Sequence, residues 1–178
     1  MSFRTMMIAG ASLASAAAAS FALPMEAEAA PRDKRFFDSV AGIWTGPGEI
    51  VAGKYKGTKF TCNLTGISAE GPAGLTLDGT CRVGMFSQPM KATISEVGNG
   101  YQGKFLDGAD GKGLDIVSGT VSGDKVVMGI NRAKLNGVMV ASVRGENKMN
   151  ITISVSVEDQ LVPVIGLKLN RQAAAKAD

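Results

Sequence analysis

The chain has 178 residues and a net charge of +3, from 19 Lys and Arg against 16 Asp and Glu. This length suits one domain, and so small and dispersed a positive charge does not indicate a nucleic-acid partner. The chain contains no histidine, which excludes Ser-His-Asp and Cys-His catalysis and removes the commonest ligand for zinc, copper and haem. We therefore expect no metal, no cofactor and no enzymatic activity.

Residues 1–29 have the pattern of a secretory signal peptide. Arg4 precedes an apolar run rich in Ala and Ser, which ends at the small-residue site Ala27-Glu28-Ala29. A membrane-spanning helix is the alternative, but it needs about 20 strongly apolar residues, and this run is shorter. We expect cleavage after Ala29, which leaves one domain over 30–178, periplasmic or secreted. No cysteine in the leader could carry a lipid anchor.

The rest of the chain predicts an all-β protein. Only residues 34–41 have a helical pattern, and from 43–51 to 161–171 apolar and polar residues alternate with a period of two. About ten strands are expected, joined by short turns rich in Gly, Asn and Asp. An antiparallel up-and-down meander closed into a barrel is favoured, because closure leaves no unpaired strand edge. A two-sheet β-sandwich is the alternative.

Both cysteines lie in one predicted hairpin. A turn about residues 68–75 places Cys62 opposite Cys81. Leu64 then faces Gly79, and the apolar residues of both strands share one face. In an oxidising compartment such a pair forms a structural disulfide, worth about 3 kcal/mol through loop closure. A catalytic dithiol is the alternative, but the chain has no C-x-x-C sequence.

The later strands are separated by predicted turns at Gly98-Asn99-Gly100, Ser122-Gly123-Asp124 and Asn136-Gly137. The strand over 114–121 has a mixed pattern, which indicates a β-bulge. Glu96 is expected to point inward, opposite Gly103. We expect it to form an ion pair with Arg171, because an unpaired buried carboxylate is costly.

The two ends of the predicted barrel carry a family resemblance. The first strand contains Gly42-Ile43-Trp44 after a short helical turn, and Arg171 ends the last strand with inward parity. A Gly-x-Trp in this position resembles the calycin superfamily of lipocalins, avidins and fatty-acid-binding proteins. The resemblance implies that Trp44 closes one end of the barrel and that Arg171 packs across it.

The resemblance is closest to the fatty-acid-binding type, which has ten strands. The chain lacks the middle-loop motif of lipocalins, and one tryptophan is too few for an avidin-like biotin site. The whole chain also resembles an uncharacterised family of exported Gram-negative bacterial proteins.

Alternate turns of a sequential barrel lie at opposite ends. Turns at the end opposite Trp44, at 52–57, 84–89, 107–113, 131–137 and 158–160, are expected to be mostly longer than those at the Trp44 end. They carry the apolar residues Tyr55, Met85, Phe86 and Leu135. We interpret these four as the mouth of a cavity for a small apolar or amphipathic ligand. The alternative is that they cap the core.

Two functions therefore remain open. One is a non-catalytic ligand-binding barrel; the other is a protein-interaction barrel, such as a protease inhibitor or a structural factor of the envelope, with 30–37 as its probe. The two functions predict different interiors: a ligand-binding barrel must leave its core partly empty, whereas an interaction barrel can pack solid. The inward glycines Gly46, Gly48, Gly79 and Gly103 either leave room in the interior or mark the bends of a closing barrel.

The acidic segment 107–115 does not have the spacing of a calcium loop.

Overall fold

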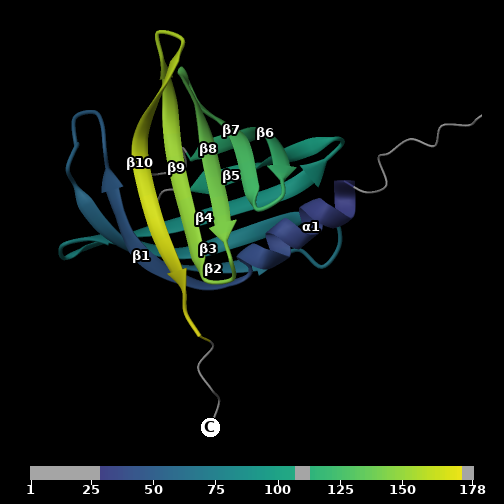
Figure 1. Ribbon diagram of the computed structural model, residues 1–178. Coiled ribbons are helices and arrows are strands. Elements are labelled where there is room, and N and C mark those ends of the chain that lie inside the picture. Colours follow the sequence, from purple (N-terminus) through teal and green to yellow (C-terminus); the bar gives the residue numbers. More distant parts are fainter. Residues whose placement is uncertain (1–28, 107–112, 174–178) are drawn as a thin grey trace, which may run out of the picture.

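A computed structural model describes residues 29–106 and 113–173. Within these residues, helix α1 (Ala29–Val40) is followed by ten strands. The strands are β1 (Gly42–Ile50), β2 (Lys59–Ser68), β3 (Gly74–Val83), β4 (Phe86–Val97), β5 (Gly100–Leu106), β6 (Leu114–Ser122), β7 (Lys125–Arg132), β8 (Leu135–Arg144), β9 (Lys148–Val157) and β10 (Gln160–Arg171). Each strand pairs antiparallel with the next, and β1 pairs with β10, so the barrel closes (Figure 1). The predicted ten-stranded meander is confirmed, and the sandwich alternative is wrong.

The hairpin of β2 and β3 has the predicted register. Cys62 lies opposite Cys81 and Leu64 opposite Gly79. The two cysteines form a disulfide with their Cα atoms 4.0 Å apart, and both side chains are buried. The structural disulfide is therefore confirmed, and it joins neighbouring strands inside the barrel wall. The predicted bulge in β6 is also present, as a register shift between Ile116 and Ser118.

The β3–β4 turn, at the end opposite Trp44, is shorter than predicted. The segment 84–89 was expected to be a loop, but the chain turns at 84–85 and Phe86 already belongs to β4, opposite Val83. Gly84 has a φ of 57°, which suits glycine and permits this tight turn. The long strands bring Phe86 to a hairpin tip and not to a loop that could fold over the barrel.

The prediction of a turn at Asn136-Gly137 is wrong. The chain reverses at 133–134, and Asn136 lies within β8, opposite Asn131 of β7. In this register Met128 faces Met139, and their side chains point into the barrel. Pairing of β8 with both neighbours fixes its position, which outweighs the local turn preference of an Asn-Gly dipeptide.

The β4–β5 hairpin also differs from its prediction. It turns at 98–99, and Glu96 does not lie opposite Gly103. The expected ion pair of Glu96 with Arg171 is wrong: the Glu96 carboxylate accepts a hydrogen bond from the backbone N–H of Ala73, at 3.1 Å. Arg171 donates to backbone carbonyls instead. The Glu96 carboxylate thus satisfies a backbone donor in the turn between β2 and β3.

Helix α1 covers one end of the barrel (Figure 1). Phe36, Phe37 and Val40 of this helix are buried against the ends of the strands. The Lys34 ammonium also donates to the carbonyl of Ala69, at 2.9 Å, which ties the helix to the β2–β3 turn. The fully buried Trp44, near the start of β1, lies at this end of the barrel. We call it the closed end.

Candidate ligand cavity

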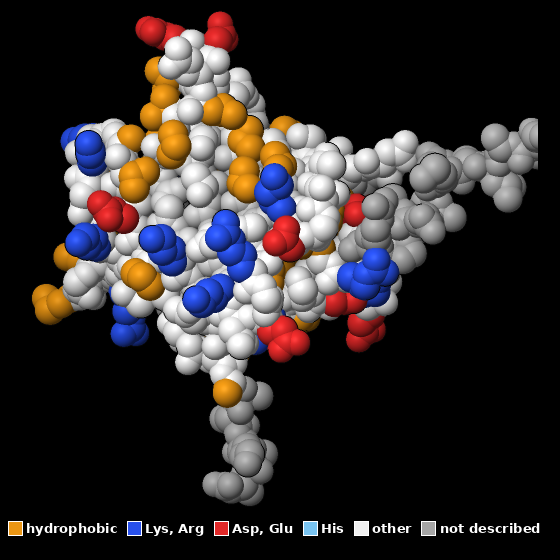
Figure 2. All heavy atoms as spheres, viewed as in Figure 1, with side chains coloured by type: hydrophobic (Ala, Val, Ile, Leu, Met, Phe, Trp, Pro, Cys, Tyr) orange, Lys and Arg blue, Asp and Glu red, His pale blue; other side chains and the backbone are white. Residues whose placement is uncertain are grey.

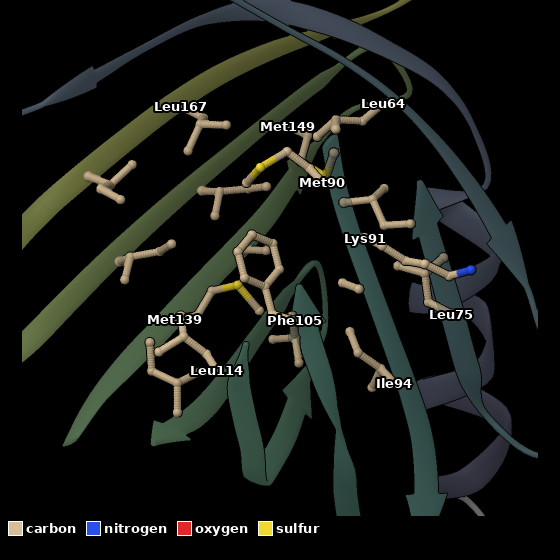
Figure 3. A pocket seen from close by; sticks show the side chains of 18 of the residues that line it. Leu64, Leu75, Met90, Lys91, Ile94, Phe105, Leu114, Met139, Met149 and Leu167 are labelled. Atoms are coloured by element: carbon tan, nitrogen blue, oxygen red, sulfur yellow. The ribbon is translucent and has the colours of Figure 1, made fainter. Parts of the chain in front are cut away.

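The barrel encloses a cavity of about 330 Å³. Its walls are apolar side chains from α1 and from β2 to β10. Figure 3 shows Phe105, Leu114 and Met139 on one side of the cavity, with Met90, Met149 and Leu167 around the remaining space. Among the described residues that line it, charge occurs only at Lys91 and Arg132.

Neither charged residue places its charge deep in the cavity. Lys91 lies between the inward-facing Met90 and Ala92, and its ammonium is 3.8 Å from the Asp78 carboxylate on the outer face. Arg132 is the last residue of β7, and its Nε donates to the carbonyl of Gly113 at 3.5 Å. Arg132 is therefore at the rim of the cavity, opposite the closed end.

Solvent exposure changes along the barrel. Lining residues near α1, such as Phe37 and Leu64, are buried. Lining residues farther from α1, such as Phe60, Phe105 and Val155, are only half-buried. The cavity is therefore open to solvent at the end opposite α1, which we call the open end.

The closed end is sealed by a cluster around Tyr101. The Phe37 ring packs against the Tyr101 ring with centroids 5.0 Å apart, and the Tyr101 hydroxyl donates to Asp33 at 2.8 Å. Burial and this hydrogen bond raise the pKa of Tyr101 well above its ordinary value. The contacts fasten α1 to the barrel.

Trp44 and Arg171 meet at the same end. The Arg171 guanidinium lies 4.2 Å from the centroid of the Trp44 ring, and the two residues are direct partners in the β1–β10 register. Arg171 also donates to the carbonyls of Ser39 and Glu146, each at 2.6 Å, and to that of Ala41. One side chain therefore connects α1, β1 and the β8–β9 turn.

Only one of the four predicted mouth residues lines the cavity. Leu135, at the start of β8, is part of the wall. Tyr55, Met85 and Phe86 are 62%, 97% and 80% exposed and project from hairpin tips at the open end. They neither cap the core nor form the wall.

The wall residues that the mouth prediction missed lie on the strands. Met90, Phe105 and Met139 line the cavity because their strand parity points inward. The alternation within each strand shows which residues point inward. Which of these residues meet to form the wall can be worked out only once the register with both neighbouring strands is known.

The inward glycines do not create the open space. A Cβ atom at Gly46 would collide with the Lys168 carbonyl, and one at Gly103 with the Thr93 carbonyl, so both mark close approaches of the backbone. At Gly48 the ring of Phe60 already occupies the position that a side chain would need. These glycines are therefore required for the bends and contacts of the wall.

Comparisons with known proteins support the fold alone. No protein-family model matches the chain, and no curated protein matches it significantly. Among solved structures it is similar to the crystal structure of Rv2717c from M. tuberculosis, with a TM-score of 0.54 and 14% identity over 79% of this chain and 98% of that one. This likeness shows a shared overall fold.

Two further observations concern metal binding and the crossing of a membrane. The described residues hold no group of three or more His, Cys, Asp or Glu side chains placed to bind a metal ion, and Asp107 and Asp110 lie outside them. In the same ranges, no helix has the length and apolar character needed to cross a bilayer.

Proposed function

We propose that this protein is an exported, non-catalytic carrier that holds one small apolar or amphipathic molecule in its barrel. The observation that carries the proposal is the apolar cavity of about 330 Å³, closed by α1 and open at the other end. Its volume is within the range of about 300–1,000 Å³ that is typical of small-molecule pockets.

The chemistry of the wall favours a hydrocarbon occupant. Water inside this cavity would find few polar partners, whereas each buried methylene group of a ligand gains about 0.8 kcal/mol. The thioethers of Met90, Met139 and Met149 are flexible and polarisable, so the wall can adapt to more than one ligand shape. A polar group of an amphipathic ligand would remain at the rim, near Arg132.

Other features support the remaining parts of the proposal. The leader pattern of 1–29 and the Cys62–Cys81 disulfide favour export to an oxidising compartment. The described lining residues include no serine, histidine or carboxylate that could act as a nucleophile or base, which favours a non-catalytic role. A protein-interaction role with 30–37 as a free probe is less well supported, because Phe36 and Phe37 are buried in the barrel end.

Native mass spectrometry of protein purified from its own compartment tests the proposal. We expect an excess mass that disappears on denaturation, or, for emptied protein, formation of a complex with dodecanoic acid or farnesol as probes. Val155→Trp should fill the open half of the cavity and weaken probe binding by about tenfold or more, because the bulky ring takes the ligand's place.

Ser156→Trp is the matched control, since this residue is exposed on the same strand. It should leave binding unchanged. A bare mass with and without both probes, or equal probe binding by both tryptophan variants, would contradict the proposal.

A further inference from the structure

Three apolar side chains at the open end have no role in the cavity. Met85, Phe86 and Tyr55 are the most exposed large hydrophobic residues that the structure describes. Met85 and Phe86 form the tip of the β3–β4 hairpin, and Tyr55 lies in the segment 51–58 that joins β1 to β2. Polar residues would serve equally well in such turns, so the folded barrel does not account for these side chains.

Basic residues flank each of these tips. Lys54 and Lys56 stand on either side of Tyr55, and the Lys54 ammonium lies 5.4 Å from the centre of the Tyr55 ring. Arg82 is exposed shortly before Met85 on the adjacent hairpin. Neither tip segment, 51–58 or 82–86, contains an acidic residue.

We propose that these two hairpin tips dock on an anionic phospholipid bilayer. Aromatic and aliphatic side chains next to Lys and Arg are the combination that interfacial anchors use: the apolar groups enter the headgroup boundary and the cations pair with lipid phosphates. Figure 2 shows hydrophobic side chains next to Lys and Arg at the left edge of the molecule, the side to which the β3–β4 turn of Figure 1 points. We call this surface, defined by Lys54, Tyr55, Lys56, Arg82, Met85 and Phe86, the tip surface.

The geometry favours a bilayer over a protein partner. The tip surface consists of two separate hairpin ends, and the described cavity lies inside the barrel, away from Met85 and Phe86. Long side chains that project from separate tips can enter a fluid interface independently, whereas a protein partner needs a continuous complementary patch. Glu158 and Asp159 form the tip of the β9–β10 hairpin at the same end of the barrel, but this hairpin rises at the top of Figure 1, apart from the β3–β4 turn.

Docking in this orientation would also bring the open end of the cavity close to the bilayer. The turns β1–β2, β3–β4, β7–β8 and β9–β10 all lie at the end opposite Trp44, and Leu135, at the start of β8, lines the cavity. A ligand could then enter from lipid without crossing water. Lipid binding by the tip surface itself does not depend on the cavity, so the two proposals can fail separately.

Cosedimentation of the disulfide-bonded protein with vesicles tests the inference. Vesicles of phosphatidylcholine containing phosphatidylglycerol should bind the protein, and vesicles of pure phosphatidylcholine should bind it much more weakly. Met85→Ser combined with Phe86→Ser should lower the partition constant by about tenfold or more, because two large apolar groups leave the interface. Lys54→Gln combined with Lys56→Gln should lower the partition constant by about fivefold per charge removed. Raising the salt concentration should also lower the partition constant of the wild type, because it screens the attraction to the anionic lipid.

Ile67→Ser combined with Val97→Ser is the matched control, since both residues are exposed at the closed end. It should bind vesicles like the wild type. Thermal unfolding and binding of the dodecanoic acid probe should be the same for all variants, which separates docking from folding and from the cavity.

Equal binding to neutral and anionic vesicles, or no loss in the Met85/Phe86 variant, would overturn the inference. Failure to bind any vesicle, with a dimer in sedimentation velocity that the Met85/Phe86 variant loses, would assign the tip surface to a second copy of this chain instead.

Discussion

The guanidinium of Arg171, the last residue of β10, lies 4.2 Å from the centre of the buried Trp44 ring at the start of β1. The same guanidinium donates to carbonyls of α1, of the α1–β1 junction and of the β8–β9 turn. Trp44 completes this arrangement by donating from Nε1 to the carbonyl of Val40, at 2.8 Å. The contact therefore joins the two ends of the meander and fastens the helix that closes the barrel.

Arg171→Ala should destabilise the protein by about 2–4 kcal/mol, because it removes charge-assisted hydrogen bonds and leaves their carbonyls unpaired. Arg171→Lys should recover little of this, since an ammonium cannot reproduce the planar fork over the ring. Urea unfolding followed by the fluorescence of Trp44, the single tryptophan of the chain, measures the loss. Lys168→Ala, at an exposed position of the same strand, is the control. Equal stability of Arg171→Ala and the wild type would show that the contact contributes nothing.

Removal of the disulfide by Cys62→Ala with Cys81→Ala should cost about 3 kcal/mol, the loop-closure entropy for a separation of this size. Reduction of the wild-type protein before urea unfolding should give a similar loss, and a reducing agent should not change the double variant. A reduced wild type as stable as the oxidised protein would contradict the entropic role.

Gly48→Ala should destabilise the protein by about 1–3 kcal/mol, because the new methyl group collides with the ring of Phe60. The displaced ring is part of the cavity wall, so binding of the dodecanoic acid probe should weaken as well. Gly166→Ala is the matched control on β10, where no atom lies within 4 Å of the added Cβ. Its stability should be unchanged or slightly higher. If both variants have wild-type stability and probe affinity, the close packing of Phe60 on Gly48 is unimportant.

The contact between Tyr101 and Asp33 predicts a pH dependence. Folding raises the pKa of Tyr101 above its ordinary value of 10.0, through burial and the hydrogen bond to Asp33. The folded state therefore holds the phenol proton more tightly than the unfolded state, so this contribution is fully present below pH 10.0 and is lost as the pH rises further.

Tyr101→Phe should have a lower stability at neutral pH, by about 1 kcal/mol for the lost hydrogen bond, and a smaller further loss above about pH 10. Urea unfolding of both proteins at neutral and alkaline pH gives the comparison, since the other ionising groups are common to both. Parallel losses of stability in the two proteins would rule out this role of Tyr101.

Much of the barrel could be predicted because its contacts are local. The pairing of Cys62 with Cys81 follows from alternation in two strands joined by one turn, and both the register and the bond are present. The same reasoning failed at Asn136, where β8 must match β7 and β9 at once. A dipeptide preference cannot account for two neighbours whose positions depend on the rest of the sheet.

The cavity could be predicted only in part for the same reason. The apolar character of the loops at the open end was visible in the sequence, but it identified the tips of the hairpins and, at Leu135 alone, the wall. The wall consists of inward residues from strands far apart in the chain. Their separation depends on strand tilt and on backbone approaches such as that of Gly103 to Thr93.

The sequence alone was therefore enough for the strand alternation, the disulfide and the pairing of consecutive strands, since each follows from the period of a strand and the short turns that join neighbours. The empty space in the barrel, the position of Arg171 across three segments and the isolation of Met85 and Phe86 at a tip required the tertiary structure. These features depend on distances between strands that the chain brings together only when the barrel closes, and closure is a property of all ten strands at once.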